Sequence, residues 1–431
     1  MTGPPAPTAR RRIPSFGRSV AQTAVFNVAA TVAAGIAGIV IARALGPTVR
    51  GEYAAIMAWF GVVLVVGELG QTTATTYFVA HDRTRAADYL ATSRNMMVST
   101  GVIALITGIV AAPLLSAGNQ VMTTGYRLVF TTCLACFVGA SYAFGLQSIN
   151  IPQWNVLRIS QPVVFAVAIG ALYLRGRLDL MSVLWTLTAT VTAQAALSYL
   201  LCRAHGLAGG HGRLELARPM TRYGLGQLAS SLPTMVTARL DQLVLSVTVV
   251  PTALGHYAVA ASVTSVAVPV VAAVGYVAFP RIASRALSHH AAARLQQWAI
   301  VSSAAVGVVI MATLAGCAAW LVPAVFGPEF RASVPLVWLF APAGVFLACG
   351  QVCGDLLRGH GRPFAVARAQ IAAAATTVAL LAVLLPLAGV AGAAITTSAA
   401  AGLALVLLLR ALSHEARSRG PTPERTKAPH G

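Results

Sequence analysis

Four polar residues that could hold an ion or a phosphate interrupt the apolar runs of this chain. Glu68 and Gln71 lie in the stretch GELGQTT, and Arg239 and Asp241 lie in the stretch TARLDQL. An ionisable side chain at membrane depth costs roughly 2.5–3.5 kcal/mol on insertion scales, so such residues usually face a polar cavity. Arginine carries a planar fork of donors that fits two phosphate oxygens at once. The pattern therefore favours an anion-binding cavity with Arg239 as its main cation.

Arg239 and Asp241 are separated by a single residue, which places them about 200° apart around a helix, so they cannot pair with each other. We expect Arg239 to face the centre of the protein and to meet either Glu68 or a phosphate of the substrate. A fixed ion pair with Glu68, which only holds two helices in register, is the alternative. Asp241 is expected either to pair within its own half of the chain or to take up a proton. Gln71 could offer its amide to a sugar.

A second polar group lies near one end of a later apolar run. Asp355 is followed by Arg358 and Arg362 in the stretch GDLLRGHGR. These residues either cap a helix at the membrane surface or form the place where a charged lipid head group first binds from the cytoplasm.

The elements that position these residues follow from composition. The chain has 431 residues, of which 57% are hydrophobic and 10% are charged, and its mean hydropathy is +0.76. A soluble protein of this size carries far more charge. The apolar runs are long enough to cross a bilayer as helices and lack the short alternation of a membrane β-barrel. We therefore expect an all-α polytopic membrane protein.

We count about twelve transmembrane helices in two lobes of six. The N-lobe spans residues 19–202 and the C-lobe spans residues 223–410. A glycine-rich stretch, 203–222, is expected to be a flexible cytoplasmic linker. The second helix is expected at Ala54–Ala80 and the seventh at Gly224–Val249. A basic segment, 1–18, precedes the first helix, which we interpret as retained rather than cleaved, and a disordered tail, 411–431, follows the last.

Basic residues predict the orientation. Most of the 30 Lys and Arg residues lie in loops on the side of the helices that holds both termini, and Arg158 is counted among them. The positive-inside rule then places both termini in the cytoplasm of a cell whose inner membrane the protein spans. The net charge of +19 is explained by loops next to anionic lipid, so membrane lipids are expected partners and nucleic acid is not.

No residue pattern suggests catalysis or metal binding. The six cysteines lie within or at the ends of apolar runs, and the pair Cys133 and Cys136 has no second pair nearby. The predicted outer loops are short and contain few acids. We expect no enzyme, no cofactor and no metal site.

One short motif occurs twice. PTVRGEYA starts at Pro47 and joins the first two helices, and PTALGHYA starts at Pro251 and joins the seventh and eighth. Because six helices separate the copies, the lobes are parallel repeats related by an axis along the membrane normal, and the substrate path is expected between them. Tyr53 and Tyr257 are expected at the outer membrane interface. Pro269, midway along the eighth helix, permits a bend there.

Four segments carry a family resemblance, and together they extend it over nearly the whole chain. They are ARALGPTVRGEYA, RLDQLVLSVTVVPTALGHYAVAA, VFGPEFRASVPLVWLFAPA and LLRGHGRPFAVAR. They resemble the polysaccharide-exporter branch of the multidrug/oligosaccharidyl-lipid/polysaccharide (MOP) flippase superfamily. The resemblance implies two lobes of helices, a cavity with cationic groups, and transfer of undecaprenyl-pyrophosphate-linked sugars to the outer leaflet. The first helix carries only Gln22, Asn27 and Thr31 at depth, which departs from the lipid II branch.

The sequence thus favours a flippase for a lipid-linked oligosaccharide, with H⁺ or Na⁺ as a possible coupling ion. One alternative keeps the fold and changes the cargo, giving a multidrug antiporter in which Glu68 or Asp241 titrates. A membrane polysaccharide polymerase or ligase is the other alternative, and it would need a larger outer loop with catalytic groups.

Overall fold

The computed structural model describes residues 16–237, 239–272, 289–360 and 362–418. Every regular element within these ranges is helical, as expected. The N-lobe contains six labelled α-helices and one short 3-10 turn: α1 (Phe16–Glu68), α2 (Gln71–His81), η1 (Arg83–Arg85), α3 (Ala86–Leu115), α4 (Gln120–Ile149), α5 (Ile151–Leu174) and α6 (Leu180–Ala204). The C-lobe contains α7 (Leu214–Thr237), α8 (Leu240–Thr248), α9 (Pro251–Ser265), α11 (His289–Phe326), η2 (Pro328–Ser333), α12 (Val334–Gly359) and α13 (Pro363–Ser418).

The predicted fold of twelve membrane helices in two lobes is confirmed. Within the described residues, nine segments are long and apolar enough to cross a bilayer. Two of them, Val25–His81 and Phe364–His414, are long enough to cross twice, and each contains a turn at a glycine with positive φ, Gly46 (70°) or Gly389 (56°). The seventh crossing is made by α7 and α8 together.

Two predicted helices are interrupted. The second breaks between α1 and α2 at Leu69 and Gly70, whose φ angles are 49° and 66°. Gly70 lies directly against α7, because a Cβ there would be 2.2 Å from the carbonyl oxygen of Gly224. The seventh is divided into α7, which ends at Thr237, and α8, which begins at Leu240 with Arg239 as its N-cap residue and Asp241 in its first turn. An acidic residue favours a helix N-terminus, which is consistent with a new helix starting there.

The stretch expected to be a flexible linker is fixed at its C-terminal end. Helix α7 already begins at Leu214, and the residues before it are held by α3. Asp88 accepts a hydrogen bond from the backbone of His211 (3.0 Å) and forms an ion pair with Arg213 (2.7 Å). The backbone of Arg213 also donates to Thr92 (3.0 Å). The start of α7 is therefore attached to the N-lobe.

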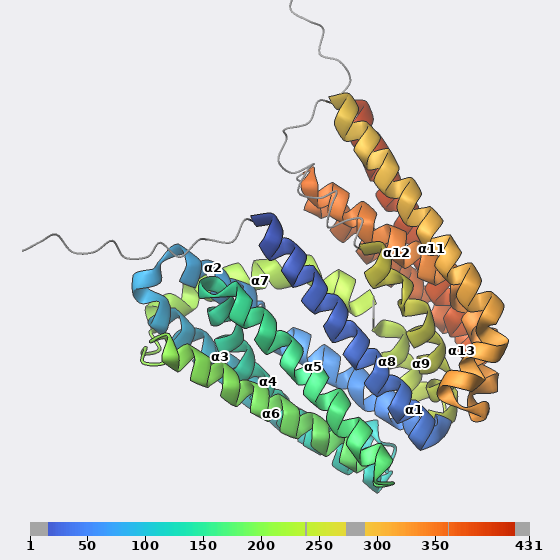
Figure 1. Ribbon diagram of the computed structural model, residues 1–431, viewed down its shortest axis with the longest axis horizontal. Helices are drawn as coiled ribbons and strands as arrows, with labels where there is room; N and C mark the ends of the chain where they lie inside the picture. Colours follow the sequence, from blue (N-terminus) through green and yellow to red (C-terminus); the bar gives the residue numbers. More distant parts are fainter. Residues whose placement is uncertain (1–15, 238, 273–288, 361, 419–431) are drawn as a thin grey trace, which may run out of the picture.

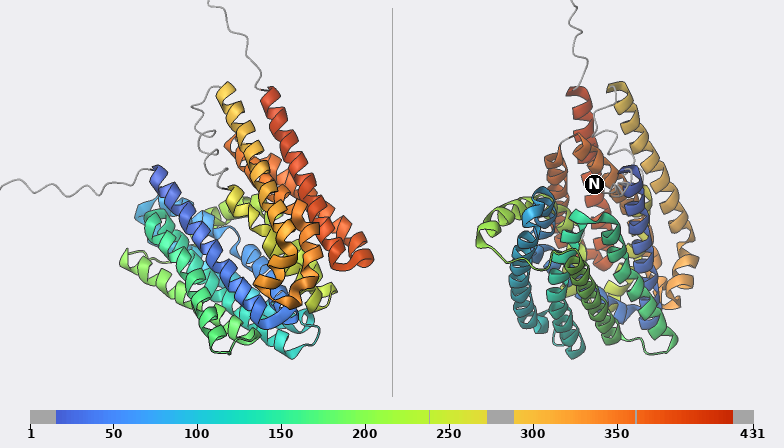
Figure 2. Two further views of the ribbon diagram at one scale, coloured as in Figure 1. Left: turned by 45° about the vertical axis from the view of Figure 1, so that its right-hand side comes forward. Right: turned by 60° about the vertical axis from the view of Figure 1, so that its left-hand side comes forward.

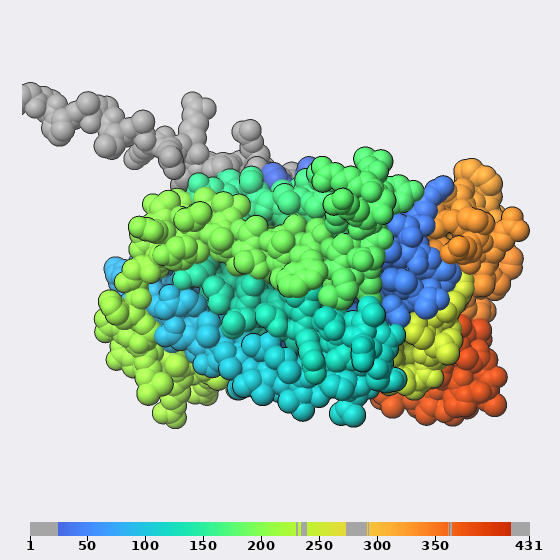
Figure 3. Space-filling model, turned by 90° about the horizontal axis from the view of Figure 1, so that it is seen from below, coloured from blue at the N-terminus to red at the C-terminus, as the bar shows by residue number. Residues whose placement is uncertain are grey.

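The two lobes meet at one end and diverge at the other. Figure 2 shows the end of α1 at Phe16 and the end of α13 at Ser418 on the divergent side. Figure 3 shows the other end, where the blue part of α1 and the yellow part of the chain around α9 lie between the green N-lobe helices and the orange and red C-lobe helices. The largest buried cluster of apolar side chains crosses this junction and includes Ile56 and Phe60 of α1 and Val259 of α9.

Candidate functional site in the seam between the lobes

The two copies of the repeated motif contact each other where the lobes meet. The hydroxyl oxygens of Thr48 and Thr252 lie 2.8 Å apart. A Cβ at Gly51 would lie 1.7 Å from the carbonyl oxygen of Pro251, and one at Gly255 would lie 1.9 Å from that of Pro47. Only glycine allows two helices to approach this closely, so both glycines are required by a contact between backbones.

Further bonds close the same end of the seam. A guanidinium nitrogen of Arg43 donates to the carbonyl of Ala324 in α11 at 2.8 Å. The indole of Trp59 in α1 donates to the hydroxyl of Ser246 in α8 at 3.0 Å. The lobes are thus joined by polar bonds on the side away from the described chain ends.

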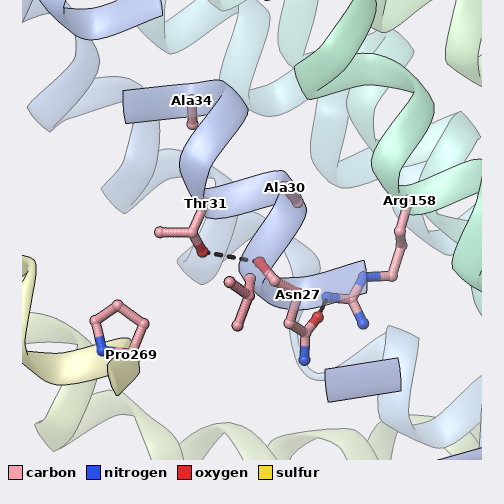
Figure 4. A pocket seen from close by; sticks show the side chains of 7 residues that line it. Asn27, Ala30, Thr31, Ala34, Arg158 and Pro269 are labelled. Carbon is pink, nitrogen blue, oxygen red and sulfur yellow. Dashed lines mark hydrogen bonds between the residues drawn. The ribbon is translucent and has the colours of Figure 1, made fainter. Parts of the chain in front are cut away.

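A cavity of about 480 Å³ lies between the lobes. Helix α1 lines it with Asn27, Val28, Ala30, Thr31 and Ala34, α5 contributes Arg158, and the C-lobe contributes Pro269. Figure 4 shows Arg158 and Asn27 pointing toward each other, with Pro269 on the opposite wall. Pro269 belongs to the short helical segment 267–272 that follows the end of α9, so the predicted bend of the eighth helix lies beside the cavity.

Arg158 is held in position by its neighbours. Its guanidinium donates to the side-chain oxygen of Asn27 and stacks over the Trp154 ring, 4.5 Å from the ring centre. The hydroxyl of Thr31 is engaged by the backbone carbonyl of Asn27 at 2.9 Å. A half-buried cation fixed by a planar stack and an amide is preorganised to bind an anion at low entropic cost.

The assignment of Arg158 to a cytoplasmic loop was wrong. Helix α5 begins at Ile151, where the Asn150 side chain caps it by accepting from the backbone of Gln153 (3.2 Å). Arg158 therefore lies two turns inside the helix. The sequence signals for this earlier helix start were the cap residue Asn150 and the Pro at the start of IPQWNVLR.

Arg239 lies beside α1 of the other lobe and apart from Glu68. It is exposed, and its guanidinium lies beside Gly61 of α1, where a Cβ would be 3.8 Å from its Cζ atom. Glu68 is seven residues further along α1, about 10 Å away on a helix, and its carboxylate accepts from the Thr72 hydroxyl. No ion pair between Arg239 and Glu68 occurs in the described part of the chain.

Asp241 is buried inside the C-lobe. Its carboxylate accepts from the Tyr257 hydroxyl, from the Thr397 hydroxyl at 3.4 Å, and from the backbone of Gln242 at 2.7 Å. These bonds connect α8, α9 and α13. They also place Tyr257 in the core with no exposed surface, so its predicted position at the membrane interface was wrong.

The remaining candidates form separate contacts. Gln71 is buried against Gly224 at the break of the second helix, and within the described residues its amide has no hydrogen-bond partner. Asp355 accepts from Arg358 at 2.7 Å in the last turns of α12, and the backbone of Arg362 donates to the Leu357 carbonyl at 2.9 Å. The structure therefore brings Asp355 and Arg358 together, and it separates both from the cavity at Arg158.

The fold and the seam define a two-lobed membrane transporter. Residues 16–286 match the family described as polysaccharide biosynthesis protein. This match spans more than half of the chain, and the chain belongs to that family. No curated protein matches the chain.

Solved structures of the MOP superfamily share the fold. A multidrug resistance MATE family transporter in an inward-facing conformation is 13% identical with a TM-score of 0.74, and the alignment covers 92% of this chain and 100% of that one. The lipid II flippase MurJ in an inward closed conformation is 11% identical with a TM-score of 0.77, covering 90% of this chain and 87% of that one. The MATE multidrug transporter DinF-BH is 15% identical with a TM-score of 0.64, covering 96% of this chain and 98% of that one. The family match over residues 16–286, together with this shared fold, confirms the predicted MOP membership.

Proposed function

We propose that the protein is a flippase that moves a polyprenyl-pyrophosphate-linked oligosaccharide across the cytoplasmic membrane by alternating access between its lobes. The observation that carries this proposal is the position of Arg158 beside Asn27 in the cavity between the lobes. A pyrophosphate is the anionic part of such a lipid, and a guanidinium can donate two parallel hydrogen bonds to it. Membership of the polysaccharide biosynthesis family supports a glycan as the attached cargo.

The cavity is suited to a lipid because one of its walls is apolar and exposed, and we expect this wall to be open to the bilayer. Val28 lines the cavity and is 51% exposed, and Val25, Val32 and Ile36 on the same helix are exposed as well. Large exposed apolar side chains on a membrane helix are solvated by acyl chains. A polyprenyl tail can therefore remain in the bilayer beside α1 while its pyrophosphate lies at Arg158.

The closed end of the seam supports alternating access. The lobes are joined at Thr48 and Thr252 and diverge toward the chain ends, which we expect to be cytoplasmic from the distribution of Lys and Arg. This arrangement corresponds to a state open to the inner leaflet. Transfer to the outer leaflet then requires the bonds between the two motif copies to break.

A deletion strain tests this function. We expect loss of the gene to leave polyprenyl-linked glycan on the cytoplasmic leaflet and to abolish surface polysaccharide. Wild-type protein is expected to remove the accumulated glycan and to restore surface polysaccharide. The variant Arg175→Ala, which changes an exposed arginine just after α5, is expected to do the same. Arg158→Ala, at normal protein abundance, is expected to leave the glycan accumulated and surface polysaccharide absent. A deletion strain with normal surface polysaccharide and no accumulated polyprenyl-linked glycan would reject the proposal.

A multidrug antiporter is the second candidate, because the inward-facing MATE family transporter covers this chain as completely as MurJ does. Ethidium efflux from cells that express the protein distinguishes the two. Efflux that is abolished by Asp241→Asn or Glu68→Gln, with normal glycan in the deletion strain, favours the antiporter.

A further inference from the structure

A second cavity of about 470 Å³ lies between α2 and α7, away from Arg158. It is lined by Thr73, Thr76, Tyr77, Ala80, His81 and Tyr223. Its volume falls in the range of about 300–1,000 Å³ that small-ligand sites occupy. Helix α2 belongs to the N-lobe, and Tyr223 lies in the first half of α7, whose start is attached to the N-lobe, so this cavity is on the N-lobe side of the molecule, away from α11–α13 (Figure 1).

Three rings in this cavity are nearly parallel. The ring centres of Tyr77 and Tyr223 are 4.6 Å apart with an angle of 15° between their planes, and those of Tyr77 and His81 are 5.9 Å apart with an angle of 6°. Phe78 packs edge-on against Tyr223 from behind, at 5.9 Å and 72°. We call Tyr77, His81 and Tyr223 the ring shelf.

The rings of the ring shelf contact one another and are still partly exposed. Tyr77 is 45% exposed and Tyr223 is 38% exposed, whereas Tyr126 and Tyr257 in the core have no exposed surface. Tyr173 and Tyr199 are exposed to a similar extent, so exposure alone does not identify a site. What distinguishes Tyr77 and Tyr223 is that their rings stack on each other in the lining of a cavity. Stacked rings cover part of each other's faces, so a ligand in the cavity can contact only the ring surface that the stack leaves exposed, and that surface is held in place by these contacts.

We propose that the ring shelf binds the glycan portion of the lipid-linked substrate, an inference that rests on the proposed function. The carbon-bound hydrogens on one face of a pyranose carry partial positive charge and stack on the negative face of an aromatic ring. The hydroxyls of Thr73 and Thr76 in the same cavity are suited to the polar rim of a sugar. If lipid acyl chains were the group that contacts these rings, replacing the rings would not change sugar binding, so a sugar-binding measurement distinguishes the two.

Saturation-transfer NMR on the purified full-length protein in detergent micelles tests the shelf directly. The probe is the set of oligosaccharides released by mild acid from the lipid-linked pool of the producing cell. We expect transfer to pyranose hydrogens, with binding weakened about five- to tenfold in Tyr77→Leu and in Tyr223→Leu. Tyr77→Phe keeps the ring and is expected to bind like wild type.

The controls separate loss of the ring from loss of the fold. Tyr173→Leu changes another exposed tyrosine, near the end of α5, and is expected to leave sugar binding unchanged. His81→Ala changes an exposed side chain at the end of α2 and is expected to weaken binding without lowering the melting temperature. Equal binding in wild type, His81→Ala and Tyr77→Leu, or no transfer to any sugar hydrogen, would overturn the assignment.

Failure of the shelf and failure of the flippase function give different results. Sugar binding is measured without transport, so a deletion strain with blocked surface polysaccharide but no ring-dependent binding rejects only the shelf. Ring-dependent binding in a protein whose deletion leaves surface polysaccharide unchanged supports the shelf and rejects the flippase.

Discussion

Thr48 and Thr252 are 204 residues apart in the chain, and their hydroxyl oxygens lie 2.8 Å apart in the structure. They occupy the same position in the two copies of the repeated motif. The reciprocal approach of Gly51 to Pro251 and of Gly255 to Pro47 shows that the copies are related by a local two-fold arrangement. The motif therefore occurs twice because its two copies contact each other, at the end where the lobes are closed.

A cysteine pair at these positions is expected to lock the transporter. In Thr48→Cys/Thr252→Cys, the sulfur atoms lie close enough for a disulfide after small side-chain rotations. The exposed Cys317 is replaced by Ser in the same background. Oxidation is expected to stop polysaccharide export and dithiothreitol to restore it. Each single cysteine variant is the control, and export that continues with the disulfide formed, as shown by gel shift, contradicts a gate at this place.

The close approach at Gly51 gives a second prediction. A methyl group there collides with the Pro251 backbone, and overpacking of this kind costs about 1–3 kcal/mol. Gly51→Ala is therefore expected to separate the lobes at their closed end and to raise labelling of a cysteine at the buried position Ala54 (Ala54→Cys) by a membrane-impermeant maleimide several-fold. Gly35→Ala in the first part of α1, where no atom lies within 4 Å, is the matched control with unchanged labelling. Equal labelling in both variants means that this contact does not hold the seam shut.

Asp241 and Tyr257 are expected to act as a structural pair. Removing one partner leaves a buried polar group unsatisfied, at a cost of roughly 1–3 kcal/mol. Asp241→Asn and Tyr257→Phe are each expected to lower the melting temperature by several degrees, with the double variant less affected than the sum of the two. Detergent-solubilised protein and a thermal-shift assay measure this. Additive losses indicate independent roles, and a stable Asp241→Asn protein without export indicates proton coupling instead.

Arg239 is expected to contribute to export through its charge at the seam. Its guanidinium lies against Gly61 of the other lobe and is exposed, so its removal leaves no buried charge unpaired. Arg239→Ala is expected to abolish export while the protein stays folded and inserted, and Arg239→Lys to retain part of the activity. Surface polysaccharide and membrane abundance are measured together. Normal polysaccharide in Arg239→Ala removes this residue from the mechanism.

The helix count and the repeat were predictable because they depend on local properties. Long apolar runs identify membrane helices, and the two motif copies fall at the same place in each set of six. The break at Gly70 was not predicted, since it accompanies a contact with a distant part of the chain, the backbone of Gly224. The sequence around Gly70 alone does not show that α7 will pack against it.

The site was only partly predictable. Arg239 could be singled out because a charge inside an apolar run has few stable environments, and its role at the seam stays a prediction. Arg158 was missed because α5 begins about two turns earlier than expected, which moves Arg158 from a loop into the helix beside a cavity. Asn27 and Thr31 were recognised as the polar residues of the first helix, but their pairing with Arg158 depends on how α1 packs against α5.

Reconstitution tests the flippase function most directly. Liposomes that contain the purified protein and a fluorescent undecaprenyl-pyrophosphate-linked trisaccharide are treated with dithionite, which quenches only the outer leaflet. We expect wild-type protein to expose nearly all of the probe to quenching, Arg158→Ala to leave about half protected as in empty liposomes, and Arg175→Ala to behave like wild type. Protection of half the probe by wild-type protein, or full quenching with Arg158→Ala, would contradict the account.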